Sequence, residues 1–411
     1  MGCPEADAGS GAEPDGCSTG SAPRTANRPS PRPPERADTH PYTDTDVDTL
    51  IRWANGQRSD LKRHALLAII STGLGAGLTT ADLLTVHGPD IRTHPDGTVT
   101  VHVHGGKPRT VTVLRRYEHL LAGLAAHVRG GWLVAPGPPP TSSTGLARQW
   151  ERAQPNPAGP DLTLRRCAVT WQQDHLRLGT RLDVLADAAG IGARILADQR
   201  VPQLAPEPDS RATTRLSTAA HPPEPRQPLP RLPAAYTRNE IDALLAWAAA
   251  QPNTQTRDYL LAILAVGLGT GLRAAEHSTT LGTDVTTDPS SGALLLTVRG
   301  TSPRTVPCLR EHEDLLRAAA HRAGDRPIVQ WTPAAGYERR AHRAPLPNGR
   351  LLPLTAERCR TTWLRAHLAS GTRLDTLTRA AGLDSTQSLA ALAAGLDPPN
   401  DTERRALLRG P

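Results

Sequence analysis

The hydrophobic residues of the chain fall into two blocks with the same order of patterns. Each block begins with a Tyr-Thr pair, at 42–43 and at 236–237, followed by apolar residues at helical spacing. A Thr in this position is typical of a helix N-cap, so an amphipathic helix is expected directly after it. A more continuously apolar helix should follow, around 65–72 and 259–266, and end at the motif Gly-Leu-Gly-x-Gly.

The second half of each block begins with alternating apolar and polar residues around a Gly/Pro turn, at 98–113 and 293–307. This period of two predicts a β-hairpin. Helical patterns then return to the end of each block. Each block is therefore expected to be mostly helical with a small antiparallel sheet, which is an α+β fold.

The two blocks are copies of one another. A shift of 194 places residues 42–79 on 236–273 with 17 of 38 positions identical, and a shift of 192 places 162–191 on 354–383 with 17 of 30 identical. Two ungapped matches in the same order indicate an internal duplication. Because the period is far longer than a solenoid repeat, each copy is predicted to be a domain.

Composition sets the boundaries of these domains. Gly (35) and Pro (39) are frequent among the 411 residues, and 17 of the 39 prolines lie in the short segments 1–41 and 201–234. Disorder is predicted for such stretches, as a tail and a linker. The prediction is a disordered tail at 1–41, a first domain at 42–200, a Pro-rich linker at 201–234 and a second domain at 235–411.

Several classes of protein are excluded by the sequence. The chain has no apolar run of membrane-spanning length and no apolar leader, so a cytoplasmic protein is expected. Its five cysteines have no zinc spacing, which favours reduced thiols and no metal or other cofactor. The glycine motifs lack a preceding strand and a following Gly-Lys-Ser/Thr, so no nucleotide is expected there. The net charge of +7 permits binding to nucleic acid.

An ordered set of motifs in the second block gives a more specific indication. Gly-Leu-Arg-x-x-Glu contains Arg273, the hairpin carries Arg304, and Arg360 stands eleven residues before a Gly. A Leu-x-x-Leu-x-x-Ala-Ala-Gly string follows. The set resembles the catalytic domain of tyrosine recombinases, the phage-integrase family, and both blocks carry versions of it.

The resemblance implies a chemistry and specific residues for it. In that family two Arg hold the scissile DNA phosphate, a hairpin Lys and His residues move protons, and a Tyr near the C-terminus is the nucleophile. Arg273 and Arg360 match the two Arg. The other positions of the second block fall on Ser302, Glu357, Thr361 and Leu383, and residues 384–395 contain no Tyr.

The first block keeps less of the set. Thr79 and Ala168 stand at its two Arg positions, whereas Lys107 matches the hairpin Lys. An ordinary turn lysine is an equally good interpretation of Lys107. Candidate contacts to DNA phosphate are positively charged residues of the second block: Arg273, Arg304, Arg339, Arg340, Arg343 and Arg360.

Each candidate also has a structural interpretation. Arg273 and Glu276 have the spacing of a helical surface pair, and Arg360 has the pattern of a solvated helix residue. Two i, i+4 pairs, Trp171–His175 and Trp363–His367, favour packing in the core. The tyrosines early in each block are expected to pack rather than react.

The sequence thus predicts a catalytically defective relative of tyrosine recombinases that binds double-stranded DNA. One alternative is an active site-specific recombinase or integrase whose nucleophile is unrecognised or donated by a partner subunit. The other is a non-enzymatic scaffold that pairs with an intact recombinase, another protein or a second copy of itself.

Overall fold

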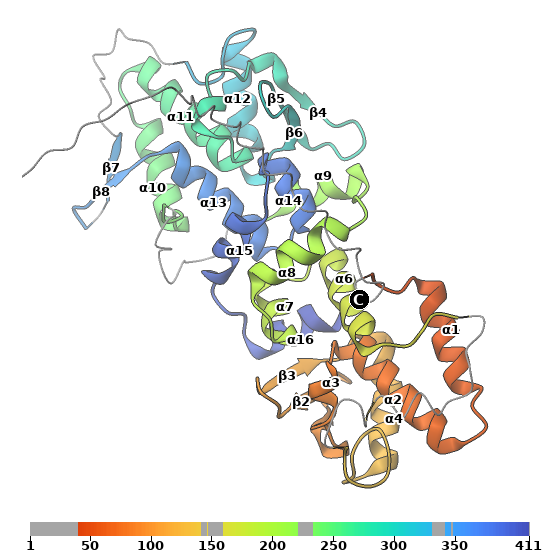
Figure 1. Ribbon diagram of the computed structural model, residues 1–411. Coiled ribbons are helices and arrows are strands. Elements are labelled where there is room, and N and C mark those ends of the chain that lie inside the picture. Colours follow the sequence, from red (N-terminus) through yellow and green to blue (C-terminus); the bar gives the residue numbers. More distant parts are fainter. Residues whose placement is uncertain are drawn as a thin grey trace, which may run out of the picture. The chain divides into compact units, whose positions relative to one another are not determined.

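The computed structural model describes residues 40–140, 146, 159–220, 233–330, 342–346 and 348–410. The predicted tail at 1–41 lies almost wholly outside these residues. The fold is α+β, mostly helical with small antiparallel sheets, as the hydrophobic pattern predicted (Figure 1). No helix in the described part of the chain is long and apolar enough to cross a membrane.

Each block opens on the helix that its Tyr-Thr pair predicted. Helix α1 (Asp44–Asn55) begins after Thr43, and α10 (Arg238–Ala249) begins after Thr237. Both threonines accept a hydrogen bond from the backbone N–H three residues on, and an acidic side chain there bonds back to the Thr N–H. This reciprocal arrangement satisfies two backbone donors that the first helical turn leaves unpaired.

The next helix of each block is almost fully buried. Helices α2 (Asp60–Ala76) and α11 (Thr254–Thr270) end at the Gly-Leu-Gly-x-Gly motif as expected, although they include its first four residues and so extend four residues beyond the expected ranges. Glycine is needed inside them because a Cβ on Gly73 would lie 2.6 Å from the Cβ of Cys167. The motif's last glycine, Gly77 or Gly271, ends each helix in the left-handed conformation.

Both predicted hairpins form, and each gains a third strand. Strands β2 (Val99–Val103) and β3 (Arg109–Thr112) pair antiparallel, as do β5 (Leu294–Val298) and β6 (Arg304–Pro307). The added strands, β1 (Ile91–Thr93) and β4 (Val285–Thr287), have only three residues each, too few to show a period of two. A separate two-stranded sheet pairs β7 (Arg343–Pro345) with β8 (Leu351–Pro353).

Helices complete each block after its sheet. Among them, α6 packs on α2 and α13 packs on α11. Trp171 and Trp363 are fully buried, each with its His partner against it at ring-centroid distances of 4.6 and 4.4 Å, so their predicted place in the core is confirmed. These helices are α4 (Arg115–Val128), α6 (Leu164–Leu178), α7 (Leu182–Ala189), α8 (Ala193–Arg200), α12 (Glu313–Ala323), α13 (Ala356–Ala369), α14 (Leu374–Ala381) and α15 (Gln387–Ala394), whereas the short α3 (Thr80–Leu83) precedes the first sheet.

The predicted linker is not wholly extended. It contains a 3-10 helix, Val201–Gln203, and the helix α9 (Asp209–Thr218). Ala212 and Leu216 of α9 are buried at helical spacing, because α9 packs against β6 of the second block. A helix of this length gains most of its stability from such packing, which its polar and Pro-flanked sequence does not reveal.

The last helix of the chain packs on the first block, just as α9 of the predicted linker packs on the second. Helix α16 (Asp401–Arg409) packs on β3 and α7 of the first block (Figure 1). In addition, α8 packs against α15, so the helices that follow the two Ala-Ala-Gly strings lie together. The described residues consequently form one compact unit.

Candidate functional site

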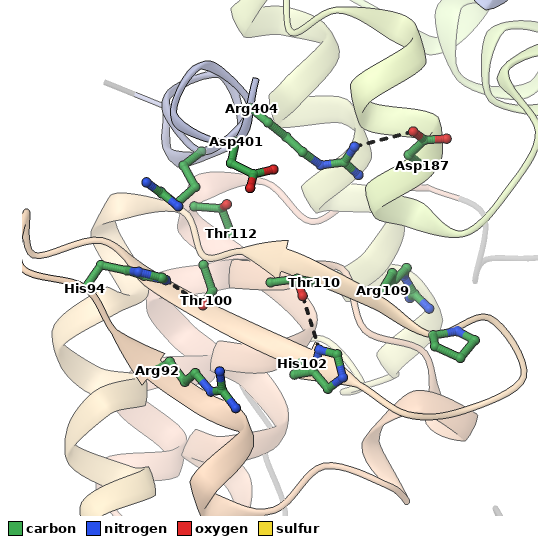
Figure 2. Close-up of a pocket in the computed structure, with 12 residues that line it drawn as sticks. Arg92, His94, Thr100, His102, Arg109, Thr110, Thr112, Asp187, Asp401 and Arg404 are labelled. Atoms are coloured by element: carbon green, nitrogen blue, oxygen red, sulfur yellow. Dashed lines mark hydrogen bonds and ion pairs between the residues drawn. The ribbon is translucent and has the colours of Figure 1, made fainter. Parts of the chain in front are cut away.

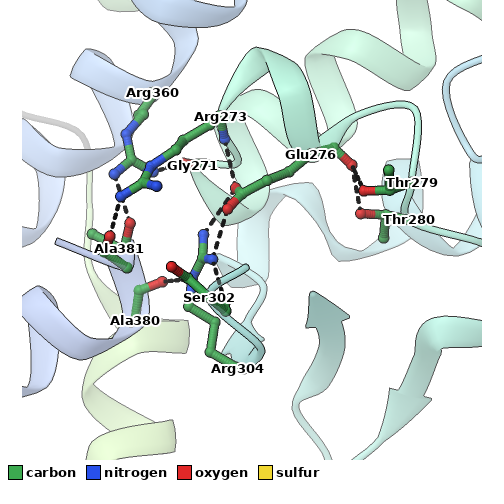
Figure 3. Close-up of polar contacts among 11 residues, drawn as sticks. Gly271, Arg273, Glu276, Thr279, Thr280, Ser302, Arg304, Arg360, Ala380 and Ala381 are labelled. Atoms are coloured by element: carbon green, nitrogen blue, oxygen red, sulfur yellow. Dashed lines mark hydrogen bonds and ion pairs between the residues drawn. The ribbon is translucent and has the colours of Figure 1, made fainter. Parts of the chain in front are cut away.

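The two arginines singled out by the family resemblance reach the same turn of the chain. Arg273 follows α11, and Arg360 lies on α13, 87 residues later. The Nη2 of Arg273 donates to the carbonyl of Gly382, and the Nη2 of Arg360 donates to the carbonyl of Ala381 at 2.6 Å (Figure 3). Arg360 also donates from Nη1 to the carbonyl of Gly271 at 2.5 Å. The fold thus brings both guanidinium groups to the C-terminal end of α14.

A third arginine and a carboxylate complete this arginine cluster, defined here as Arg273, Arg304, Arg360 and Glu276. Arg304 donates from Nη1 and Nη2 to the two carboxylate oxygens of Glu276, at 2.7 and 2.9 Å. Its Nε donates to the carbonyl of Ala380 at 2.8 Å. Glu276 also accepts the backbone N–H of Arg273 at 2.8 Å. The predicted surface pair between the side chains of Arg273 and Glu276 is therefore replaced by a pair with Arg304.

The electrostatics of the arginine cluster favour an anion. Burial, and then the nearby positive charges of Arg273 and Arg304, lower the pKa of Arg360 to about 10. Burial alone would raise the pKa of Glu276, but the hydrogen bonds from Arg304 and from the backbone of Arg273 lower it. Three partly buried guanidinium groups therefore have only one carboxylate, Glu276, among them. An added negative charge beside them would stabilise the charged form of Arg360.

The other family positions of the second block hold no group that could replace the missing ones. Ser302 accepts from Arg304 through its backbone carbonyl at 3.0 Å. Glu357 is exposed, and its carbonyl accepts a hydrogen bond from the hydroxyl of Thr361 at 2.9 Å. Leu383 is partly buried against the hydrophobic core.

A histidine that sequence reasoning missed lies beside the arginine cluster. His277 follows Glu276 directly and is buried. Burial lowers the pKa of His277, so the ring is neutral at neutral pH, and its Nε2 has no hydrogen-bond partner among the described residues. His277 directly follows the Glu of the Gly-Leu-Arg-x-x-Glu motif. This position matches none of the family's His positions, so the resemblance did not identify His277 as a candidate.

The first block has equivalent contacts between its hairpin and the end of α7, but with fewer arginines. Arg109 donates to both carboxylate oxygens of Asp82, at 3.0 and 2.8 Å, and from Nε to the carbonyl of Ala188 at 2.8 Å. Lys107 donates to the carbonyl of Gly190 at 2.7 Å. Thr79, where the second block has Arg273, caps α3. Lys107 and Arg109 therefore tie the hairpin to the end of α7.

The remaining predicted residues divide between described and undescribed parts of the chain. Arg339 and Arg340 lie outside the described residues. Arg343 begins β7 and is exposed. The carbonyl of His342, next to it, accepts the N–H of Leu354 at 2.7 Å.

Four of the five tyrosines lie within the described residues, and three of them are buried in the core. The hydroxyls of Tyr42 and Tyr236 donate to the carbonyls of Asp161 and Pro353, at 2.6 and 2.7 Å, and burial raises their pKa. Burial raises the pKa of Tyr117 to about 12. Tyr259 is partly buried against the core. None of these four follows Arg360 in the chain, as the family's nucleophile would.

Comparison with known proteins adds no identification. No protein-family model matches the chain, and no curated protein matches it. Within the described residues, no group of three or more His, Cys, Asp or Glu side chains lies close enough to hold a metal ion. The geometry of the arginine cluster is therefore the main basis for inferring a function.

Proposed function

We propose that the chain is a catalytically defective relative of tyrosine recombinases that binds double-stranded DNA without cutting it. The observation that carries the proposal is the meeting of Arg273 and Arg360 at the end of α14. These are the two positions that the resemblance assigns to phosphate binding. A guanidinium fork suits phosphate oxygens, and phosphate contacts supply most of the sequence-independent affinity for DNA.

The arginines retain donors for a phosphate. A guanidinium carries five N–H donors, and the hydrogen bonds to Ala381, Gly382 and Gly271 use only some of those on Arg273 and Arg360. The carbonyls hold the two side chains in place. A phosphate would also offset the positive charges of Arg273 and Arg304, which add to the effect of burial in lowering the pKa of Arg360.

Cleavage is not part of the proposal because a nucleophile is missing. Residues 384–395 contain no Tyr, and α15 in this stretch packs against α8 and α13. Loss of a catalytic nucleophile costs on the order of 10⁶ in rate in a well-studied enzyme. Binding through the arginines does not depend on that residue.

A non-enzymatic scaffold is the second candidate, and one observation favours it. Arg273, Arg304 and Arg360 all donate to backbone carbonyls at residues 380–382, so their charge also serves to hold α14 in place. On this alternative the protein pairs with an intact recombinase or with a second copy of itself and has no affinity for DNA.

A gel shift with a labelled DNA duplex at two salt concentrations separates the candidates. The DNA-binding proposal predicts a shifted band at low salt that weakens steeply as salt rises, because phosphate contacts release counterions. A nicked duplex that traps covalent intermediates should give no protein–DNA band under denaturing conditions. Absence of any shift at low salt would contradict DNA binding, and a covalent band would contradict the loss of cleavage.

A further inference from the structure

A cavity of about 640 Å³ lies between the first sheet and α16 (Figure 2). Its floor is built from threonine and histidine side chains at alternate positions of β2 and β3, which share one face of the sheet. Thr100 and Thr112 on this floor are buried. Small-molecule sites are commonly concave and of this volume.

Basic side chains line the cavity from two directions. Arg92 enters from β1 and Arg404 from α16, and His94 and His102 lie along the floor (Figure 2). Arg405, which is also on α16, belongs to the same lining. Arg92 is exposed, and its side chain has neither a hydrogen bond nor an ion pair among the described residues. The Nε of Arg405 is buried and has no acceptor within the part of the chain that the structure describes.

The acidic groups of the cavity do not balance these arginines. Asp187 pairs with Arg404 at 3.4 Å but is largely exposed, and Asp401 is exposed at the start of α16. Arg109, which also lines the cavity, is neutralised by Asp82, which lies outside it. The Nη2 of Arg405 has only a 3.5 Å contact to the hydroxyl of Thr402, at the outer limit for a hydrogen bond. Among the described residues, Arg92 and Arg405 therefore have no carboxylate at ion-pair distance, and the exposed Asp96 interacts with Arg405 only through its charge.

The second block provides an internal comparison. A cavity of about 480 Å³ lies between its sheet and α9, in the place equivalent to the cavity under α16. Strand register pairs Arg92 with Thr100 in the first sheet and Thr286 with Leu295 in the second. Thr286 thus occupies the position of Arg92, and two residues later Asp288 occupies the position of His94.

This difference shows that Arg92 and His94 are not required for packing a helix on the sheet. Helix α9 packs on the second sheet although Thr286 and Asp288 stand at these two positions, while Arg304 and Arg379 still line that cavity. Arginines without a carboxylate partner are expected to repel one another when they enclose a cavity, and a bound anion removes that cost. The basic groups of the first cavity are thus placed for an anionic ligand.

We propose that the cavity between the first sheet and α16 binds a small phosphate-bearing anion, either a phosphate ester or a pyrophosphate. Arg92 and Arg405 bind the phosphate oxygens from opposite sides, and the hydroxyls of Thr110 and Thr112 face the polar remainder of the ligand. A guanidinium on either side matches a tetrahedral group with oxygens in several directions. This site is separate from the arginine cluster and does not rest on the proposed DNA binding.

Isothermal titration calorimetry of the full chain tests the proposal, with inorganic pyrophosphate and adenosine 5′-monophosphate as probes. At least one probe should bind with a sub-millimolar Kd, and both Arg92→Gln and Arg405→Gln should weaken that binding at least about tenfold. Arg379→Gln is the matched control, because Arg379 is exposed and lines the second cavity. It should leave the affinity unchanged.

Three results would overturn the proposal. The first is no binding of either probe at millimolar concentration, and the second is an equal loss of affinity in Arg379→Gln. The third is that Arg92→Gln and Arg405→Gln weaken the binding of a DNA duplex but not the binding of either small probe. The cavity would then be part of a DNA-binding surface. Pyrophosphate binding that survives in Arg273→Gln/Arg360→Gln would separate this site from the arginine cluster.

Discussion

Arg304 and Glu276 form a two-pronged ion pair that recurs, between Arg109 and Asp82, in the first block. In both blocks the arginine is the first residue of the last strand of the three-stranded sheet, and the carboxylate lies just after the long buried helix. The Nε of each arginine also donates to the end of α14 or α7. One side chain thus joins three segments that are far apart in sequence.

Loss of this carboxylate should destabilise the fold. The side chains of Arg304 and Glu276 are only 6% and 12% exposed. Removing one partner of a buried pair leaves a charge unpaired, so Glu276→Gln should lower the free energy of unfolding by about 3 kcal/mol. Urea denaturation measures this change. The control Glu357→Gln, at an exposed position, should change the free energy by less than about 0.5 kcal/mol.

Part of the loss of folding stability at low pH should come from a buried histidine, His175. Burial lowers the pKa of His175 to about 3, whereas an unfolded histidine has a pKa near 6.5. Below pH 6.5 the unfolded chain therefore binds a proton that the folded protein does not, and stability falls as the pH is lowered towards 3.

The variant His175→Gln should remove that contribution. Between pH 6.5 and pH 5 the wild type should lose about 2 kcal/mol more stability than the variant. Urea midpoints at pH 7 and pH 5 give the comparison. Equal losses in the two proteins would mean that His175 does not set this pH dependence.

The glycine at the end of each buried helix should not tolerate a side chain. Gly77 has φ of 62°, and a Cβ there would lie 2.3 Å from the ring of Trp171. Gly77→Ala should cost more than about 2 kcal/mol, from backbone strain and the clash together. Gly123→Ala, on an exposed face of α4 with open space around it, should instead stabilise by up to about 1 kcal/mol. Thermal unfolding of both variants tests the contrast.

The sequence predicted those elements whose signals are local. The Thr43 and Thr237 caps, both hairpins and the Trp–His pairs depend on residues within a few positions of one another. The glycine motif was correctly expected to end each buried helix, but its first glycines were not expected to lie inside the helix, because Gly73 is required by a distant residue, Cys167, 94 positions later. Helix α9 was missed for the same reason, since its apolar face is covered by the second block.

The sequence named the three arginines of the cluster but not their contacts. The motif order identified Arg273, Arg304 and Arg360, and the structure brings them together. Their shared target, the carbonyls of residues 380–382, could not be foreseen, because backbone acceptors have no sequence signature. The pairing of Glu276 with Arg304 depends on a strand that begins 28 residues later.

The terminal helix should matter for stability despite its position at the end of the chain. Leu408 of α16 is fully buried, and Arg409 pairs with Glu118 of the first block at 2.9 Å. Leu408→Ala should therefore cost about 2–4 kcal/mol. Leu351→Ala, at an exposed position, should cost less than about 0.5 kcal/mol, and urea denaturation distinguishes the two. A Leu408→Ala cost as small as that of the control would contradict the packing of α16 on the first block.

The most direct test of DNA binding through the arginine cluster is fluorescence anisotropy with a labelled duplex at low salt. We predict that Arg273→Gln/Arg360→Gln weakens binding at least about tenfold, because each removed arginine also removes a phosphate contact. The matched control, Arg58→Gln/Arg310→Gln, removes two exposed arginines and the same net charge, and it should change the affinity by less than about threefold. Wild-type protein that does not bind the duplex, or a control that loses as much affinity as the cluster variant, would contradict the account.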